Sequence, residues 1–227
     1  TMYYSPDLLS TTIPDVFVTG SEDTGTAFFL TVNLSKRTDD SLIQSPPQPA
    51  VSSNTVIVTW EEITKNPYPD IDFRDIFVAT STDRGKTFSP KVNLTNRNGQ
   101  SRDPKIGVSG DTAIIVWQNH ADSMSGIFVA TSTDRGGHFS KPVKISSGSG
   151  GTSSPQLSIS GDRVAIVWQE NIGDNAEIMV ATSTNRGKSF LEPVNVSKNS
   201  GASTAPQVGT SGNNIVIAWY DNTTGYH

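Results

Sequence analysis

DIFVATSTDRGKTFSPKVNLT, residues 75–95, holds two strand-like apolar segments separated by the short polar segment STDRGKTF. Nearly the same sequence returns as GIFVATSTDRGGHFSKPVKIS at 126–146 and as EIMVATSTNRGKSFLEPVNVS at 177–197, with an offset of 51 residues each time. A more divergent copy, DVFVTGSEDTGTAFFLTVNLS, occupies residues 15–35. Four related copies indicate a repeat architecture.

A second unit alternates with the first. It reads PQPAVSSNTVIVTWEE at 47–62, PKIGVSGDTAIIVWQN at 104–119, PQLSISGDRVAIVWQE at 155–170 and PQVGTSGNNIVIAWYD at 206–221. In each copy a proline precedes a tryptophan by thirteen positions, and the pairs are Pro47 and Trp60, Pro104 and Trp117, Pro155 and Trp168, and Pro206 and Trp219. Each unit predicts two short strands around a turn, so the two units together predict a four-stranded antiparallel blade.

The polar segment has a structural role in this reading. Gly85 can adopt the positive φ of a tight turn, Asp83 can accept hydrogen bonds from turn amides, and Phe88 can fold back over the hairpin. The predicted fold class is therefore all-β, a β-propeller of four-stranded antiparallel blades.

Composition excludes several function classes. The chain has 227 residues, 34% apolar and 17% charged, with a formal net charge of −5 and no basic cluster, which argues against nucleic acid as a partner. No apolar segment approaches the roughly 18–20 residues that span a bilayer. Cysteine is absent, so disulfides and thiolate metal sites are excluded.

The pattern Ser-x-Asp-x-Gly-x-x-Phe resembles the Asp-box, or bacterial neuraminidase repeat, of the sialidase-like β-propellers. The four boxes are Ser21, Asp23, Gly25 and Phe28; Ser81, Asp83, Gly85 and Phe88; Ser132, Asp134, Gly136 and Phe139; and Ser183, Asn185, Gly187 and Phe190. The resemblance covers about residues 13–221. It implies a fold more than an activity, because Asp-boxes lie on the rim away from the catalytic face and occur in many proteins that are not enzymes.

Four copies of each unit predict four blades, closed into a ring when the C-terminal pair of strands (206–221) completes the N-terminal hairpin (15–35). Residues 1–14 are then an N-terminal extension of a single domain, 15–227. The alternatives are a fragment of a larger array of blades and one half of an eight-bladed dimer.

The resemblance also implies which residues a sialidase would need: three arginines for the substrate carboxylate, a tyrosine and glutamate nucleophile pair, and an aspartate acid/base. The Arg-Ile-Pro type of motif near the start is missing, and Arg74 alone leads directly into a blade strand. His120, His138 and His227 have no metal-ligand spacing. The sequence therefore predicts no catalytic residues and favours a protein that is not an enzyme.

The long segment ITKNPYPDIDFRD (63–75) is the main candidate for a ligand site. Asp70, Asp72 and Asp75 could hold Ca²⁺ through carboxylate oxygens, and Tyr68 with Arg74 could contact a sugar. The alternative is an ordinary solvated loop, and no other cofactor is expected.

Sequons Asn-x-Ser/Thr begin at Asn33, Asn93, Asn195 and Asn222. They predict glycosylation of an exported chain, with the alternative that Asn and Thr simply alternate outward on edge strands.

The functional hypothesis from sequence is a noncatalytic, secreted or cell-surface propeller that recognises carbohydrate or a surface protein. The alternatives are a sialidase-type glycoside hydrolase and a structural subunit of a surface layer or filament. A homo-oligomer is compatible with each of them.

Overall fold

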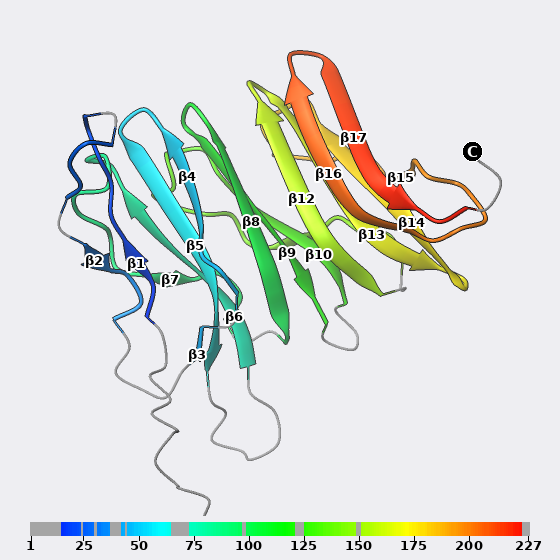
Figure 1. The fold of residues 1–227 in the computed structure, drawn as a ribbon, viewed down its shortest axis with the longest axis horizontal. Coiled ribbons are helices and arrows are strands. Elements are labelled where there is room, and N and C mark those ends of the chain that lie inside the picture. Colours follow the sequence, from blue (N-terminus) through cyan, green and yellow to red (C-terminus); the bar gives the residue numbers. More distant parts are fainter. Residues whose placement is uncertain are drawn as a thin grey trace, which may run out of the picture.

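The computed structural model describes residues 15–23, 25–29, 31–36, 42–43, 45–64, 73–96, 99–120, 125–148 and 151–223. These residues form antiparallel sheets that stand side by side in an open fan (Figure 1). The all-β fold and the four-stranded blades predicted from the repeat are confirmed. Within the described residues, no helix has the length and apolar character needed to cross a membrane.

Two blades contain four strands in chain order. Blade 2 consists of β8 (Ser101–Ser109), β9 (Thr112–Asn119), β10 (Gly126–Ser132) and β11 (Val143–Lys144). Blade 3 consists of β12 (Thr152–Ser160), β13 (Arg163–Ile172), β14 (Asn175–Ser183) and β15 (Val194–Asn195). The strand pairs β9–β10 and β13–β14 join the two repeat units into one blade.

Blade 1 has a divided first strand. Its long strands β5 (Thr55–Thr64) and β6 (Phe73–Ser81) are followed by β7 (Val92–Asn93), and both β3 (Leu42–Ile43) and β4 (Gln48–Ser52) pair with β5. In blades 2 and 3 the first strand is continuous, but its register shifts next to Pro104 and Pro155. Proline has no N–H for the ladder, so the strand bulges or breaks there.

Two half-blades flank the three blades. The N-terminal half-blade pairs β1 (Phe17–Val18) with β2 (Val32–Asn33), and the C-terminal half-blade pairs β16 (Ser203–Ser211) with β17 (Asn214–Asp221). They lie at opposite ends of the fan, in blue and red in Figure 1. Closure of the ring by exchange of terminal strands is therefore not shown. The predicted extension, residues 1–14, lies outside the described residues.

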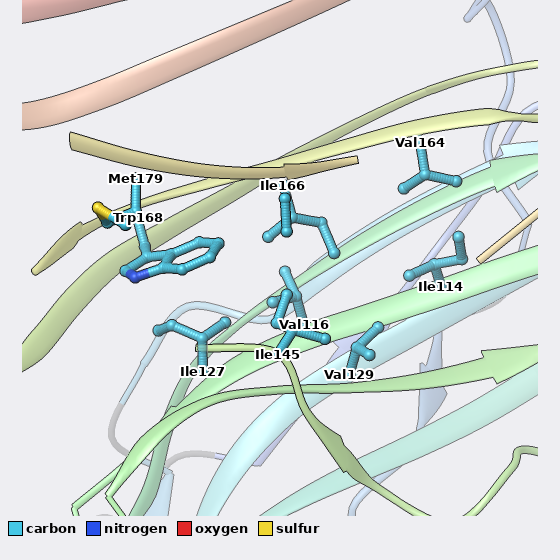
Figure 2. Packing of buried hydrophobic residues seen from close by; sticks show 10 residues of the cluster. Ile114, Val116, Ile127, Val129, Ile145, Val164, Ile166, Trp168 and Met179 are labelled. Carbon is cyan, nitrogen blue, oxygen red and sulfur yellow. The ribbon is translucent and has the colours of Figure 1, made fainter. Parts of the chain in front are cut away.

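The core lies between the blades. Figure 2 shows Ile114 and Val116 of blade 2 facing Ile166 and Trp168 of blade 3, and two similar clusters fill the other spaces between blade 1 and its neighbours. Because each middle strand faces a neighbour on both sides, it is apolar at consecutive positions. Trp60, Trp117 and Trp168 are at most 1% exposed.

The turns at 81–88, 132–139 and 183–190, called box turns below, hold one blade to the preceding one. In the first, the Ser81 Oγ donates to Asp83 at 2.7 Å and accepts the amide N–H of Gly85 at 2.8 Å, with Gly85 at φ +88°. The Thr80 hydroxyl of blade 1 donates to the Gly136 carbonyl of the second box turn at 3.0 Å. The box turns therefore fix the spacing between blades as well as the hairpins.

Candidate functional site

The end of the blades opposite the box turns carries the connections between middle strands and the entries into the first strands. At this end, charged and amide side chains from blades 1 and 2 meet between neighbouring strands. We name this group the polar cluster; its members are Glu61, Arg74, Arg102, Asp103 and Gln118.

Glu61 is the most buried charged residue of the cluster. It follows Trp60 on β5, where the side chain turns toward blade 2, and only 3% of it is exposed. Arg74 on β6 approaches it with Nη1 2.5 Å from Oε1, and the backbone N–H of Asp103 donates to Oε2 at 3.4 Å. One carboxylate oxygen of Glu61 is thus bound by a donor from blade 1, and the other by a donor from blade 2.

Asp103 occupies the bulge of β8. Its φ is +51°, and the equivalent bulge residues Ser154 and Ala205 have φ of +53° and +52°. A bulge redirects a side chain relative to the regular pleat. Here it lets Asp103 accept a hydrogen bond from the Gln118 side-chain amide at 2.7 Å while the residue stays partly exposed.

Arg102 and Gln118 contribute polar atoms that have no partner among the described residues. The Nε of Arg102 and the Oε1 of Gln118 are buried without a hydrogen bond, although Arg102 Nη2 donates to Gln100 at 3.3 Å. A buried donor or acceptor that lacks a partner costs folding free energy. Each of these two atoms is suited to a hydrogen bond with a bound water or a hydroxyl group.

His120 lies at the edge of the cluster, just after β9. Its pKa is lowered, mainly by burial and further by the positive charge of Arg102, while Asp103 acts in the opposite direction. The imidazole is therefore favoured in its neutral form near pH 7.

At the junction of two blades, the polar cluster places the Glu61 carboxylate, bound to the Arg74 guanidinium group, against the backbone of a second acidic residue, Asp103. A pair of carboxyl groups is the usual equipment for hydrolysis of a glycosidic bond, in which one acts as acid and the other as base or nucleophile. The arrangement can therefore support acid/base chemistry.

The structure separates the residues that sequence grouped in the long loop. Arg74 joins the polar cluster, whereas Asp75 is fully buried and accepts hydrogen bonds from Asn93 at 3.0 Å and from the Thr95 hydroxyl at 2.6 Å. Tyr68, Asp70 and Asp72 lie outside the described residues. Within the described chain no group of three or more His, Asp or Glu side chains forms a metal site. Calcium binding stays a prediction.

The sequon asparagines take part in blade structure. The side-chain amides of Asn33 and Asn93 each donate to an aspartate at 3.0 Å, and the Oδ1 of Asn195 accepts the N–H of Ser197 at 3.1 Å. Asn222 accepts the N–H of Ala202 at 2.5 Å. These hydrogen bonds give the asparagines of the Asn-x-Ser/Thr pattern a structural role. Glycosylation remains a prediction.

Glu61, Arg102, Asp103 and Gln118 were missed at the level of sequence. The available signal was a comparison between repeats: Gln118, Gln169 and Tyr220 stand where blade 1 has Glu61, and Ser154 and Ala205 stand where blade 2 has Asp103. These charges depart from the repeat, so the repeated fold does not require them.

A groove of about 850 Å³ lies elsewhere, between the outer edges of blades 2 and 3 beside the box turns. The charged side chains that line it are exposed, with His138 and Asp134 at 92% and 47%. Buried and mutually bonded charges, by contrast, occur in the polar cluster. We therefore place the candidate site at the polar cluster.

No family model matches the chain, and no curated protein sequence matches it. Solved structures do share its fold. The GH93 α-L-arabinofuranosidase of Fusarium graminearum, in complex with arabinobiose, has a TM-score of 0.53 at 18% identity, over 88% of this chain and 65% of that one. An α-L-arabinanase of Penicillium chrysogenum has a TM-score of 0.52 at 14% identity, over 79% and 59%. A family 117 glycoside hydrolase from the marine bacterium Zobellia galactanivorans has a TM-score of 0.50 at 12% identity, over 77% and 65%.

These comparisons correct two predictions. The expectations of a noncatalytic binding propeller and of a chain that is not an enzyme are contradicted, because the three solved structures just described are glycoside hydrolases. They are glycosidases other than sialidases, so the sialidase-like assignment remains a resemblance carried by the box turns. At 12–18% identity the likeness shows the fold alone, and this chain spans less than two thirds of the length of each of the three structures.

Proposed function

We propose that the chain is the whole or part of a glycoside hydrolase that acts at the polar cluster. The observation that carries the proposal is the contact between adjacent blades at Glu61, whose carboxylate is bound by Arg74 at 2.5 Å and by the backbone N–H of Asp103 at 3.4 Å. The fold shared with glycoside hydrolases supports it.

The chemistry follows from the two carboxyl groups. Hydrolysis breaks the bond between the anomeric carbon and the leaving oxygen, adds the hydroxyl of water to the carbon, and transfers a proton to the leaving group. Asp103 is partly exposed and held by Gln118, so it is the group we assign to contact the sugar and exchange the proton. Glu61, with its position fixed by Arg74, supplies negative charge beside the carbon where positive charge develops.

The substrate class we propose is an arabinofuranosyl linkage. Its support is that the two solved structures with the highest similarity described above act on arabinofuranosides and arabinan. Arginine and amide groups such as Arg102 and Gln118 suit the recognition of sugar hydroxyls by hydrogen bonds.

The test is hydrolysis of arabinobiose and of linear arabino-oligosaccharides by the chain, followed by chromatography of the released sugar. We expect Asp103→Asn to lower kcat by at least about 100-fold, the range typical of losing a general acid or base. Because the amide oxygen still accepts the hydrogen bond from Gln118, the variant should keep its fold. Glu192→Gln, an exposed change beside the box turns, is the matched control.

Equal rates for Asp103→Asn and the unmodified chain would refute the assignment of Asp103. If no arabinoside is turned over, a panel of other furanosides and pyranosides tests the hydrolase proposal itself, and a silent panel would reject it.

A further inference from the structure

We propose that blade 3 binds a divalent cation through the carboxylates of Glu170 and Glu177 and the hydroxyl of Thr152. These residues form one row across the sheet, because Thr152 lies opposite Glu170 in the β12–β13 pair and Glu170 lies opposite Glu177 in the β13–β14 pair. Opposite residues of antiparallel strands point to the same face, with Cβ atoms about 4.5–5.5 Å apart. The row shares no residue with the polar cluster, and the proposal is independent of the hydrolase activity.

The row is buried at the junction of blades 2 and 3. Glu170 follows Trp168 by two positions, so it shares the face on which Trp168 joins the apolar cluster with Ile127 of blade 2 (Figure 2). Only 3% of Glu170, 6% of Glu177 and 2% of Thr152 is exposed. Burying a carboxylate without a compensating positive charge is costly, so two of them on one face call for a cation.

The described residues supply no such cation. None of their lysine, arginine or histidine side chains forms an ion pair with either glutamate. Glu170 accepts the indole N–H of Trp168 at 2.7 Å, and Glu177 accepts a hydrogen bond from Asn175 at 2.9 Å and another from the Ser197 hydroxyl. These donors are neutral, so they satisfy oxygen atoms without balancing the charge.

Blade 1 contains the equivalent pair of acids together with a cation. Glu62, two residues after Trp60, lies opposite Asp75, and the Lys91 ammonium binds the two oxygens of Glu62 at 2.8 and 2.9 Å. In blade 3 the residue at the place of Lys91 is Pro193. Pro193 lines the groove of about 850 Å³ described above, so solvent reaches this position. Blade 3 therefore keeps the buried acids and lacks the lysine that accompanies them in blade 1.

The Thr152 hydroxyl is an independent sign of a ligand. Its Oγ1 is buried and has no hydrogen-bond partner among the described residues, although the residue lies opposite Glu170. Carboxylate and neutral oxygen atoms are the ligands of hard divalent cations, and Mg²⁺ in particular is held by one or two carboxylates while it keeps several waters. The row thus offers both the oxygen ligands and the negative charge that Ca²⁺ or Mg²⁺ requires.

Blade 2 offers a matched control. Ser101 corresponds to Thr152, is 1% exposed, and also has a buried Oγ without a partner in the part of the chain that the structure describes. Its row continues with Asn119 and Gly126, which carry no charge. We therefore expect no cation at this row, although its hydroxyl is equally buried.

The test compares the Tm of the whole chain after treatment with EDTA and after addition of Ca²⁺ or Mg²⁺ in separate samples. A ligand that binds only the folded chain raises its Tm, by roughly 5–10 °C at about 100 times Kd for a chain of this size. We expect this shift in the unmodified chain and in Ser101→Ala, and its loss in Glu170→Gln and Thr152→Val. Gln retains a side-chain oxygen that can accept the Trp168 N–H, so Glu170→Gln should keep that hydrogen bond.

Pro193→Lys tests the same idea in the opposite direction. It introduces into blade 3 the ammonium group that Lys91 provides in blade 1, so we expect its Tm to be insensitive to EDTA and to both cations. An unmodified chain whose Tm responds to neither Ca²⁺ nor Mg²⁺ overturns the proposal. A shift that persists in Glu170→Gln also overturns it, because the ion then binds elsewhere, for example in the segment 63–75.

Discussion

Gly136→Ala tests whether the box turns connect neighbouring blades. Gly136 has φ +80°, and a Cβ built there would lie 2.6 Å from Ile57 Cδ1 and 2.9 Å from Thr80 Oγ1 of blade 1. Gly85 has nearly the same backbone conformation, φ +88°, but its Cβ would meet Val56 Cγ2 at an ordinary 3.7 Å. The two glycines therefore have similar backbone strain. They differ in that a Cβ at Gly136 would collide with the neighbouring blade, whereas a Cβ at Gly85 would make an ordinary contact within its own blade.

The expected magnitudes follow from these two terms. A left-handed conformation costs an L-residue about 1–2 kcal/mol, and overpacking of a buried site costs about 1–3 kcal/mol. We expect Gly85→Ala to lower the free energy of unfolding by about 1–2 kcal/mol and Gly136→Ala by about 2–5 kcal/mol. The assay is urea denaturation followed by tryptophan fluorescence, because Trp60 and Trp117 are buried between these blades. Equal losses for the two variants would refute the role of the box turn in the contact between blades.

Three further predictions concern other polar contacts. The pKa of Asp83 is lowered to about 2 by hydrogen bonds from Thr87 and Ser81. Its ionised form therefore stabilises the fold above about pH 4, and this contribution is lost toward pH 2. In acid titrations, the difference in unfolding free energy between the unmodified chain and Asp83→Asn should shrink across that interval. Trp168→Phe removes the 2.7 Å hydrogen bond to buried Glu170 and should cost about 2–3 kcal/mol in urea denaturation, whereas a loss below 0.5 kcal/mol would contradict this role. Arg74→Ala leaves Glu61 buried without its guanidinium partner and should lower the free energy of unfolding by about 3 kcal/mol at pH 7. An unchanged Tm in calorimetry would contradict this prediction.

The sequence was sufficient to predict the strand pairing within a blade, but it was insufficient to predict how the blades close into a ring. The 51-residue period, the apolar runs ending in tryptophan and the glycine turns fixed which strands pair, because each signal is local to one repeat. Closure depends on what completes the two half-blades, β1–β2 and β16–β17, and no signal within one repeat reports that.

The long loop shows a different limit. Arg74 and Asp75 are adjacent in sequence, and the aspartates nearby indicated a common ligand site. Neighbouring residues on a strand point to opposite faces of the sheet, so Arg74 reaches Glu61 toward blade 2 while Asp75 turns to Asn93. Grouping by sequence distance therefore joined side chains that the strand separates.

The polar cluster could be predicted by comparing the residues at equivalent positions of the repeat copies. Ser154 and Ala205 hold the same bulge conformation as Asp103, with φ of +53° and +52°, so neither the turn nor the register requires a carboxylate there. Gln169 likewise occupies the place of Glu61 in a well-packed blade. The sialidase resemblance predicts three arginines that bind a substrate carboxylate, and it does not predict a pair of carboxyl groups at these positions. Glu61 and Asp103 are replaced by uncharged residues in the other copies, so the fold does not require their charges. These are the two carboxyl groups that the proposed chemistry at the junction of blades 1 and 2 would use.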